Sequence, residues 1–143
     1  MVPADDGASP APIDRSVLER MRSRFARSQL FEWSELVEAS ELHLRVELSA
    51  DYYPDEASTR FEVRWYRNND FNFHYQEERN GDMWLCRWDR HPNAHNSRDH
   101  FHPPTEASRI DAENAHWPAD HRDVSRLVLD RIEERIETLW DRR

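Results

Sequence analysis

A chain of 143 residues with 37% hydrophobic residues and six tryptophans suits a single domain with one modest core. It has no apolar run near the ~18 residues of a membrane-spanning helix, and its first residues lack the apolar region of a secretory signal, so neither segment is predicted. The single cysteine, Cys86, excludes an internal disulfide and predicts a reducing, cytoplasmic location, with the thiol packed in the core.

The chain is acidic overall, and its basic residues are all arginine. The net charge is −9, and all 20 basic residues are Arg. This composition resembles that of halophilic proteins, whose self-repulsion is screened where molar salt shortens the Debye length to ~3 Å. Residues 60–103 contain 7 acidic residues and 7 Arg, for a net charge of zero, together with five His. An anionic partner is therefore repelled least at the centre of the chain.

The N-terminal part is predicted to be a disordered lead-in followed by a helix. Residues 1–13, with acidic residues and prolines, form the lead-in, and residues 14–143 form one α+β domain. Asp14 is a suitable N-cap, and apolar residues recur behind it at helical spacing, which predicts a helix over 14–28. Residues 29–40 are compatible with either a second short helix or an edge strand.

Alternating apolar residues predict a four-stranded antiparallel meander in the middle of the chain. The alternation covers residues 42–48, 61–65, 71–75 and 84–88. A C-terminal amphipathic helix follows, capped by Asp120, with an apolar stripe that packs on the sheet. The predicted fold is therefore α+β: an N-terminal helix, the meander, a His-rich loop and the C-terminal helix.

The hairpin around Asn80-Gly81 predicts which side chains face each other on the last two strands. Asn-Gly is typical of a two-residue type I′ turn. That turn places His74 opposite Arg87 and Asn72 opposite Asp89, on the face that does not form the core. The apolar residues of both strands then point to the other face.

The preceding hairpin is predicted to have a three-residue loop at 68–70, since Asn and Asp tolerate positive φ. This register places Arg64 beside His74 and Tyr66 beside Asn72. Arg64 and Arg87 would then flank one imidazole, an arrangement that favours binding of a phosphate between the guanidinium groups. The alternative is a solvated sheet face, on which Glu62 and Asp89 neutralise the arginines.

The His-rich loop at 90–104 contains four histidines that can reach the same face if the loop folds back over it. Acid–base chemistry, a metal site completed by Asp89 or Asp99, and a solvated loop are the three interpretations. The spacing matches no zinc signature, so no metal or other cofactor is predicted. The four histidines are His91, His95, His100 and His102.

Three short motifs of the chain resemble the TumE-like toxin family. They are HYQ at 74–76, RWD at 87–89 and the run ending in HFHPP at 100–104, with His91 and His95 where that family has its turn histidines. In this chain the prolines follow the last histidines instead of preceding them. The resemblance covers residues 60–104 and the C-terminal helix. It implies a toxin of a type II toxin–antitoxin pair that acts on RNA and has a helix-turn-helix antitoxin.

Together these features predict a small, metal-independent endoribonuclease. Arginines would hold the scissile phosphate, His74 and one loop histidine would act as base and acid, and Asp89 would orient one of these groups. The alternative is a non-catalytic binding module or metal-binding protein that docks a helix-turn-helix regulator, and a homodimer is compatible with either. The predicted catalytic residues are His74, Arg87, Asp89, His91, His95, His100 and His102, and the predicted substrate-binding residues are Arg64, Tyr66 and Asn72.

Overall fold

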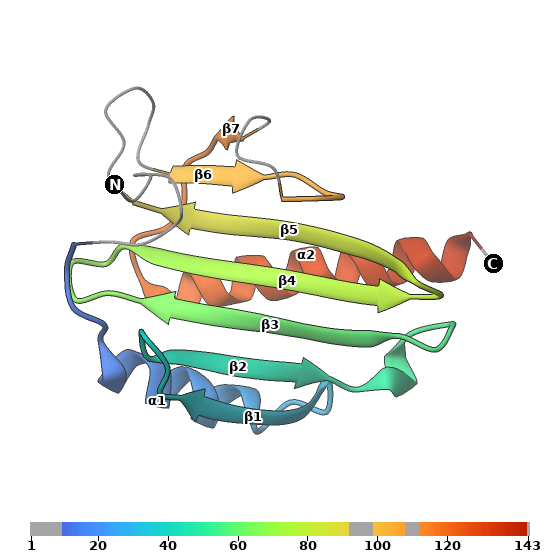
Figure 1. The fold of residues 1–143 in the computed structure, drawn as a ribbon, viewed down its shortest axis with the longest axis horizontal. Coiled ribbons are helices and arrows are strands. Elements are labelled where there is room, and N and C mark those ends of the chain that lie inside the picture. Colours follow the sequence, from blue (N-terminus) through green and yellow to red (C-terminus); the bar gives the residue numbers. More distant parts are fainter. Residues whose placement is uncertain (1–9, 92–98, 108–111, 143) are drawn as a thin grey trace.

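The computed structural model describes residues 10–91, 99–107 and 112–142, which form one antiparallel sheet and two long helices (Figure 1). The sheet has seven strands in the order β1-β2-β3-β4-β5-β6-β7, so each strand pairs with its neighbours in the chain. In chain order the elements are α1 (Arg15–Phe25), β1 (Phe31–Val37), β2 (His43–Leu48), the 3-10 turn η1 (Ala50–Tyr52), β3 (Ser58–Trp65), β4 (Phe71–Arg79), β5 (Asp82–Arg90), β6 (Asp99–His102), β7 (Glu113–Asn114) and α2 (His121–Asp141).

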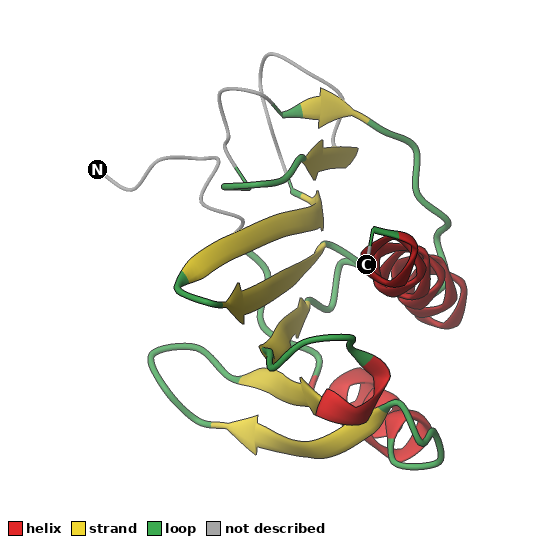
Figure 2. Cartoon of the chain, turned by 90° about the vertical axis from the view of Figure 1, so that its right-hand side faces the viewer, coloured by secondary structure: helices red, strands yellow, loops and turns green. Residues whose placement is uncertain are grey.

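Both helices lie on the same face of the sheet (Figure 2). The buried side of α1 includes Leu18 and Met21, and that of α2 includes Val128 and Ile132. These residues join the alternating apolar residues of the strands in one core cluster. Among the described residues no helix lies on the other face of the sheet, which leaves the polar side chains of the strands there. None of the described helices is both long and apolar enough to cross a membrane.

The two helix starts are confirmed by their caps. The carboxylate of Asp14 accepts from the backbone N–H of Val17 at 3.2 Å, and that of Asp120 accepts from Arg122 N–H at 2.8 Å. Helix α1 ends at Phe25, three residues earlier than predicted. Residues 1–9 of the predicted lead-in lie outside the described residues. Near its end, Ile13 forms a bridge with Tyr66, so this part of the segment contacts the sheet.

The α+β class is confirmed, but the strand number of four is wrong. Residues 29–40 contain the edge strand β1 (Phe31–Val37), and an edge strand is one of the two alternatives that the sequence left open. β6 and β7 were not predicted. β6 is only four residues long, and three of those are Asp or His, which carry no apolar alternation. β7 has two residues, too few for any periodic signal.

The β4–β5 hairpin has the predicted register. His74 faces Arg87 and Asn72 faces Asp89, and the turn residues Asn80 and Gly81 have φ values of 53° and 83°. Both values are positive, as a type I′ turn requires. The motif Asn-Gly therefore fixes the neighbours of His74 on one side.

The β3–β4 hairpin is shifted by two residues from the prediction. Arg64 faces Asn72, and Glu62 instead of Arg64 faces His74. The loop still has three residues, but they are 67–69, because the N–H of Tyr66 donates to the carbonyl of Asp70 at 2.9 Å. Asn69 is the last loop residue and has φ 67°. In a three-residue hairpin the last position is left-handed, and Asn adopts this conformation more readily than most residues.

Because Asn69 adopts this conformation, its replacement by alanine is expected to destabilise the hairpin. Asn69→Ala should lower the free energy of unfolding by up to about 1–2 kcal/mol, because alanine bears the full cost of a left-handed conformation, whereas the short polar side chain of asparagine reduces it. Asn69→Gly should lower it less, since glycine has no such cost. Urea unfolding of the two variants measures the difference. Equal stability of the alanine variant and the wild type would contradict the loop assignment and the register that follows from it.

Candidate functional site

The candidate site lies on the polar face of β3–β6. Its central row runs across four strands, from Glu62 through His74 and Arg87 to His102. His74 is half-buried, and the side chain of Arg87 is 15% exposed. The pairing of His74 with Arg87 is confirmed. The expectation that two arginines flank His74 is wrong, because the register places the carboxylate of Glu62 on its other side.

Arg64 and Tyr66 are held by the same acidic residue, away from the central row. Arg64 Nε lies 3.2 Å from Glu41 Oε1, and the Tyr66 hydroxyl donates to that oxygen at 2.9 Å. Tyr66 is fully buried, so the structure does not offer it to a ribose or a base. Asn72 is 5% exposed and lies between Arg64 and Asp89. No motif in the sequence pointed to Glu41, which precedes β2 in the chain.

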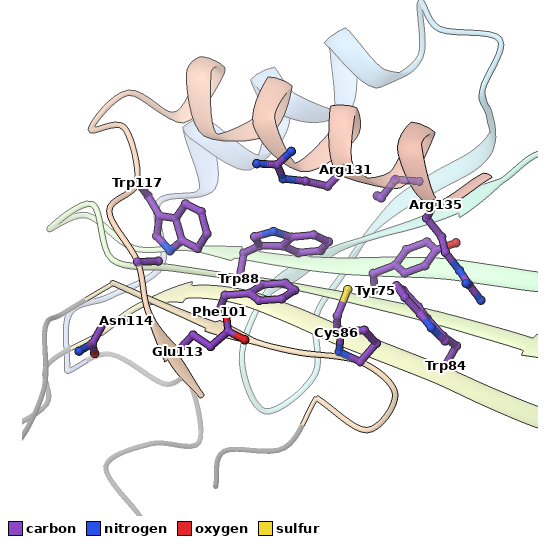
Figure 3. A pocket seen from close by; sticks show the side chains of 13 residues that line it. Tyr75, Trp84, Cys86, Trp88, Phe101, Glu113, Asn114, Trp117, Arg131 and Arg135 are labelled. Atoms are coloured by element: carbon purple, nitrogen blue, oxygen red, sulfur yellow. The ribbon is translucent and has the colours of Figure 1, made fainter. Parts of the chain in front are cut away.

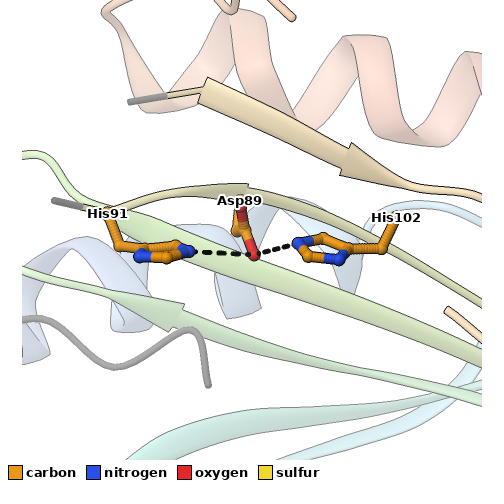
Figure 4. Close-up of side chains that lie close together, drawn as sticks. All are labelled: Asp89, His91 and His102. Atoms are coloured by element: carbon orange, nitrogen blue, oxygen red, sulfur yellow. Dashed lines mark hydrogen bonds and ion pairs between the residues drawn. The ribbon is translucent and has the colours of Figure 1, made fainter. Parts of the chain in front are cut away.

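A buried cluster of histidines surrounds Asp89, whose side chain is 0% exposed. One carboxylate oxygen, Oδ2, lies 2.8 Å from His102 Nε2, 3.1 Å from Arg87 Nε and 3.7 Å from His91 Nε2. The other oxygen, Oδ1, lies 3.5 Å from His100 Nδ1. Figure 4 shows His91 and His102 on either side of Asp89, with both rings directed at the carboxylate. Asp89, His91 and His102 offer ligand atoms that all lie within 4.8 Å of one another.

Strand pairing brings this cluster together. Asp89 and His91 are two residues apart, and so are His100 and His102, so each pair projects to one side of the sheet. β6 runs antiparallel to β5 and places His100 opposite Asp89 and His102 opposite Arg87. The sequence predicted a loop folding over the face, whereas its closing part joins the sheet as β6. His95 lies outside the described residues.

Burial separates the predicted catalytic histidines into two groups. The side chains of His91, His100 and His102 are 1%, 3% and 2% exposed, so in this conformation they cannot contact an RNA strand. His74 is the one partly exposed imidazole among the predicted catalytic residues that the structure describes. A group that abstracts a proton must reach it within hydrogen-bond distance, which favours His74 for that role.

The surroundings of His74 favour its neutral form. Burial, followed by the positive charge of Arg87, lowers the pKa of this imidazole below its ordinary value of 6.5. Glu62 opposes the shift, and the more distant Arg64 and Arg60 add to it. Burial also lowers the pKa of His100. A neutral imidazole can accept a proton at neutral pH, as a general base must.

A separate aromatic groove lies on the helix-covered face, between α2 and strands β5 and β6 (Figure 3). Its volume is about 360 Å³, and Trp88, Phe101 and Cys86 contribute to its lining. Burial raises the pKa of the Cys86 thiol to about 12. The thiol therefore stays protonated, which agrees with a packing role and not with that of a nucleophile.

The comparison with known families gives one match. A family model described as Toxin TumE matches residues 21–136, which is most of the chain. The matched range contains the hairpin with His74 and Arg87, the segment with His100 and His102, and the larger part of α2. No curated protein and no solved structure shows significant similarity to the chain.

Proposed function

This chain belongs to the TumE toxin family, and from that premise we propose that it acts as a toxin by cleaving RNA. Cleavage of RNA without an external nucleophile needs a base for the ribose 2′-hydroxyl, a cation for the phosphate and an acid for the leaving 5′-oxygen. The chain offers the first two of these on the polar face of its sheet.

The pairing of His74 with Arg87 carries this proposal. The two residues are cross-strand neighbours on the face that no described helix covers. Arg87 donates to Asp89 at 3.1 Å, and its guanidinium also lies 3.2 Å from His102 Nε2, so it has a fixed position on the strand that pairs with that of His74. A guanidinium binds phosphate oxygens through directed N–H donors, and the neighbouring neutral imidazole accepts the 2′-hydroxyl proton. His74 is the proposed base and Arg87 the proposed phosphate ligand.

Other residues would support substrate binding. Arg60 and Arg64 lie on the same face of the sheet as His74 and are partly exposed. The strands that carry His74 and Arg87 both belong to the segment 60–103, whose net charge is zero. These arginines would attract the RNA backbone at short range. The sequence left the proton donor open among the four loop histidines, and we propose His95, which lies outside the described residues, because the other three are buried.

Membership of a toxin family implies an antitoxin as partner. We propose that this antitoxin is a helix-turn-helix protein whose gene lies beside the toxin gene. Co-expression would test the pair: the neighbouring protein should suppress growth arrest and should copurify with this chain. A neighbouring helix-turn-helix protein that does neither would contradict this part of the proposal.

Comparing RNA with DNA tests the proposed activity. The purified chain should cleave an RNA oligonucleotide and leave 2′,3′-cyclic phosphate ends, while DNA of the same sequence, which lacks the 2′-hydroxyl, should stay intact. Arg87→Ala should abolish both cleavage and growth arrest, because the phosphate loses its guanidinium. Arg126→Ala, which removes an exposed arginine from the helix α2, is the matched control and should behave as the wild type. Cleavage of the DNA, or growth arrest by the Arg87→Ala variant, would overturn the assignment.

A non-catalytic binding module is the second candidate, and the burial of the histidine cluster favours it. Imidazoles that are almost fully buried are suited to holding the sheet together or to binding a metal, without a direct role in RNA cleavage. Under this alternative the toxin would act by binding alone. Growth arrest by a His74→Ala variant, together with intact RNA in every assay, would favour the binding module.

A further inference from the structure

We propose that Asp89, His91 and His102 bind a divalent transition-metal ion, of which zinc is the first choice, with His100 as the fourth ligand. The sequence predicted no metal site because the spacing of these residues matches no zinc signature. The pairing of β5 with β6 brings them together nevertheless. Binding of the ion does not depend on the proposed RNA cleavage; the role argued for it below rests on that proposed function.

The distances suit a small ion with nitrogen and oxygen ligands. Zinc binds imidazole nitrogen and carboxylate oxygen at about 2.0–2.2 Å in a tetrahedron, which places neighbouring ligand atoms roughly 3.3 Å apart. Asp89 Oδ2 lies 2.8 Å from His102 Nε2 and 3.7 Å from His91 Nε2, on either side of that value. The ligand atoms of the three residues all lie within 4.8 Å of one another, so one ion can contact all three once the side chains close around it.

His100 is an independent observation that points to a ligand. It is 2% exposed, and among the described residues neither of its ring nitrogens has a hydrogen-bond partner. Its Nδ1 faces Asp89 Oδ1, at 3.5 Å, and this oxygen also lacks a hydrogen-bond partner in the part of the chain that the structure describes. A buried polar atom without a partner is unfavourable, and an ion bound by both the Asp89 carboxylate and His100 Nδ1 would satisfy these atoms.

The chemistry of the ligands selects the class of metal. Three imidazoles and one carboxylate suit zinc and the neighbouring first-row transition metals. Magnesium and calcium prefer sets of oxygen atoms and are not expected here. The positive charge of the ion would also compensate the fully buried carboxylate of Asp89, for which Arg87 is the one permanently charged partner among the described residues.

Arg87 links the ion to the polar face. A carboxylate has about four acceptor positions, so Asp89 can bind the ion and still accept from Arg87 Nε. The ion would hold Asp89 in place and, through it, the guanidinium that we assign to the phosphate. It would also attach the four-residue strand β6 to β5. In the proposed function, this ion fixes the position of the phosphate ligand.

Metal analysis of the full chain without a histidine tag tests the inference. After incubation with zinc and desalting, the wild type should retain one zinc ion per chain, and chelation should lower its melting temperature. Cobalt in place of zinc should give the visible absorption of a tetrahedral site. A folded wild type that retains no zinc and shows no cobalt absorption would overturn the proposal without any variant.

Four variants test the position of the ion. His91→Ala and His102→Ala should each abolish stoichiometric binding, whereas His116→Ala, which removes an exposed histidine, should retain it. His74→Ala should bind zinc as the wild type does while losing RNA cleavage. Retention of one ion by both His91→Ala and His102→Ala would overturn the assignment. Zinc binding by a wild type that cleaves no RNA would sustain the metal site and end the proposed function, so the two failures are distinguishable.

Discussion

Replacing His74 by alanine is expected to lower kcat/KM for RNA cleavage by about 10²–10⁴-fold, the usual contribution of a positioned general base. The reason is geometric. His74 combines partial exposure with a cross-strand arginine on the open face of the sheet, and the predicted histidines of the Asp89 cluster lack that exposure. Arg87 would remain in place in the variant, because Asp89 and not His74 holds it. RNA binding should therefore be weakened much less than cleavage.

The pH profile gives a second readout of the same variant. Burial and the charge of Arg87 lower the pKa of His74, and Arg64 and Arg60 act in the same direction against Glu62. The neutral, proton-accepting form therefore persists below pH 6.5, so the acid limb of kcat/KM should lie below the ordinary histidine value. In His74→Ala this limb should disappear from the residual activity.

His116→Ala serves as the control for His74→Ala. It removes an exposed imidazole that lies outside the central row, and it should leave both the cleavage rate and the pH profile unchanged. Circular dichroism and thermal unfolding should show that His74→Ala keeps its fold, because its side chain is only partly buried. Wild-type cleavage by the His74 variant, or an acid limb above pH 7 in the wild type, would contradict the role of this residue.

Strong local signals in the sequence were enough for part of the fold and of the site. Asn80-Gly81 predicted a type I′ turn, and the observed register opposes His74 to Arg87 as expected. Both helix caps, Asp14 and Asp120, were also identified from residue type and the apolar pattern behind them. Each of these features depends on a few residues that are adjacent in the sequence, so it can be predicted without knowledge of the tertiary structure.

The prediction for the β3–β4 hairpin was wrong by one position of its loop. Moving a three-residue loop by one residue along the chain shifts the cross-strand pairing by two residues. The apolar side chains then stay on the core face, and only the identity of each residue's cross-strand neighbour changes. The apolar pattern therefore could not reveal the error. The left-handed preference of the last loop position, which suits Asn69 better than Asp70, could have done so. This single shift replaced Arg64 by Glu62 beside His74.

The strand pairing that completes the cluster around Asp89 could not be predicted, because β6 has no apolar pattern. β6 contains Asp99, His100, Phe101 and His102, and Phe101, which packs against Trp88, is its one apolar residue. In an extended segment His100 and His102 point to one side, but the sequence does not identify the partner strand. The pairing with β5 depends on contacts that no local motif specifies.

Asp89→Asn is expected to cause the largest loss of stability among these variants, about 3–5 kcal/mol, the usual cost of removing one partner of a buried ion pair. Asp89 is 0% exposed and accepts from both Arg87 and His102. The amide keeps the shape of the side chain but removes its charge, so the guanidinium of Arg87 stays largely buried without a counter-charge. Asparagine also directs an NH₂ group at one of these donors. Urea unfolding should show a lower midpoint with an unchanged m-value.

Glu134→Gln is the matched control, since it removes a carboxylate from an ion pair with Arg131 in which both side chains are more than half exposed. Exposed pairs contribute little, so its unfolding midpoint should stay close to that of the wild type. Asp89→Asn should also lose growth arrest, because Arg87 loses the contact that fixes its position. If Asp89→Asn is as stable as the wild type, the carboxyl of Asp89 does not act as the counter-charge of Arg87. The site would then depend on another group to position its guanidinium.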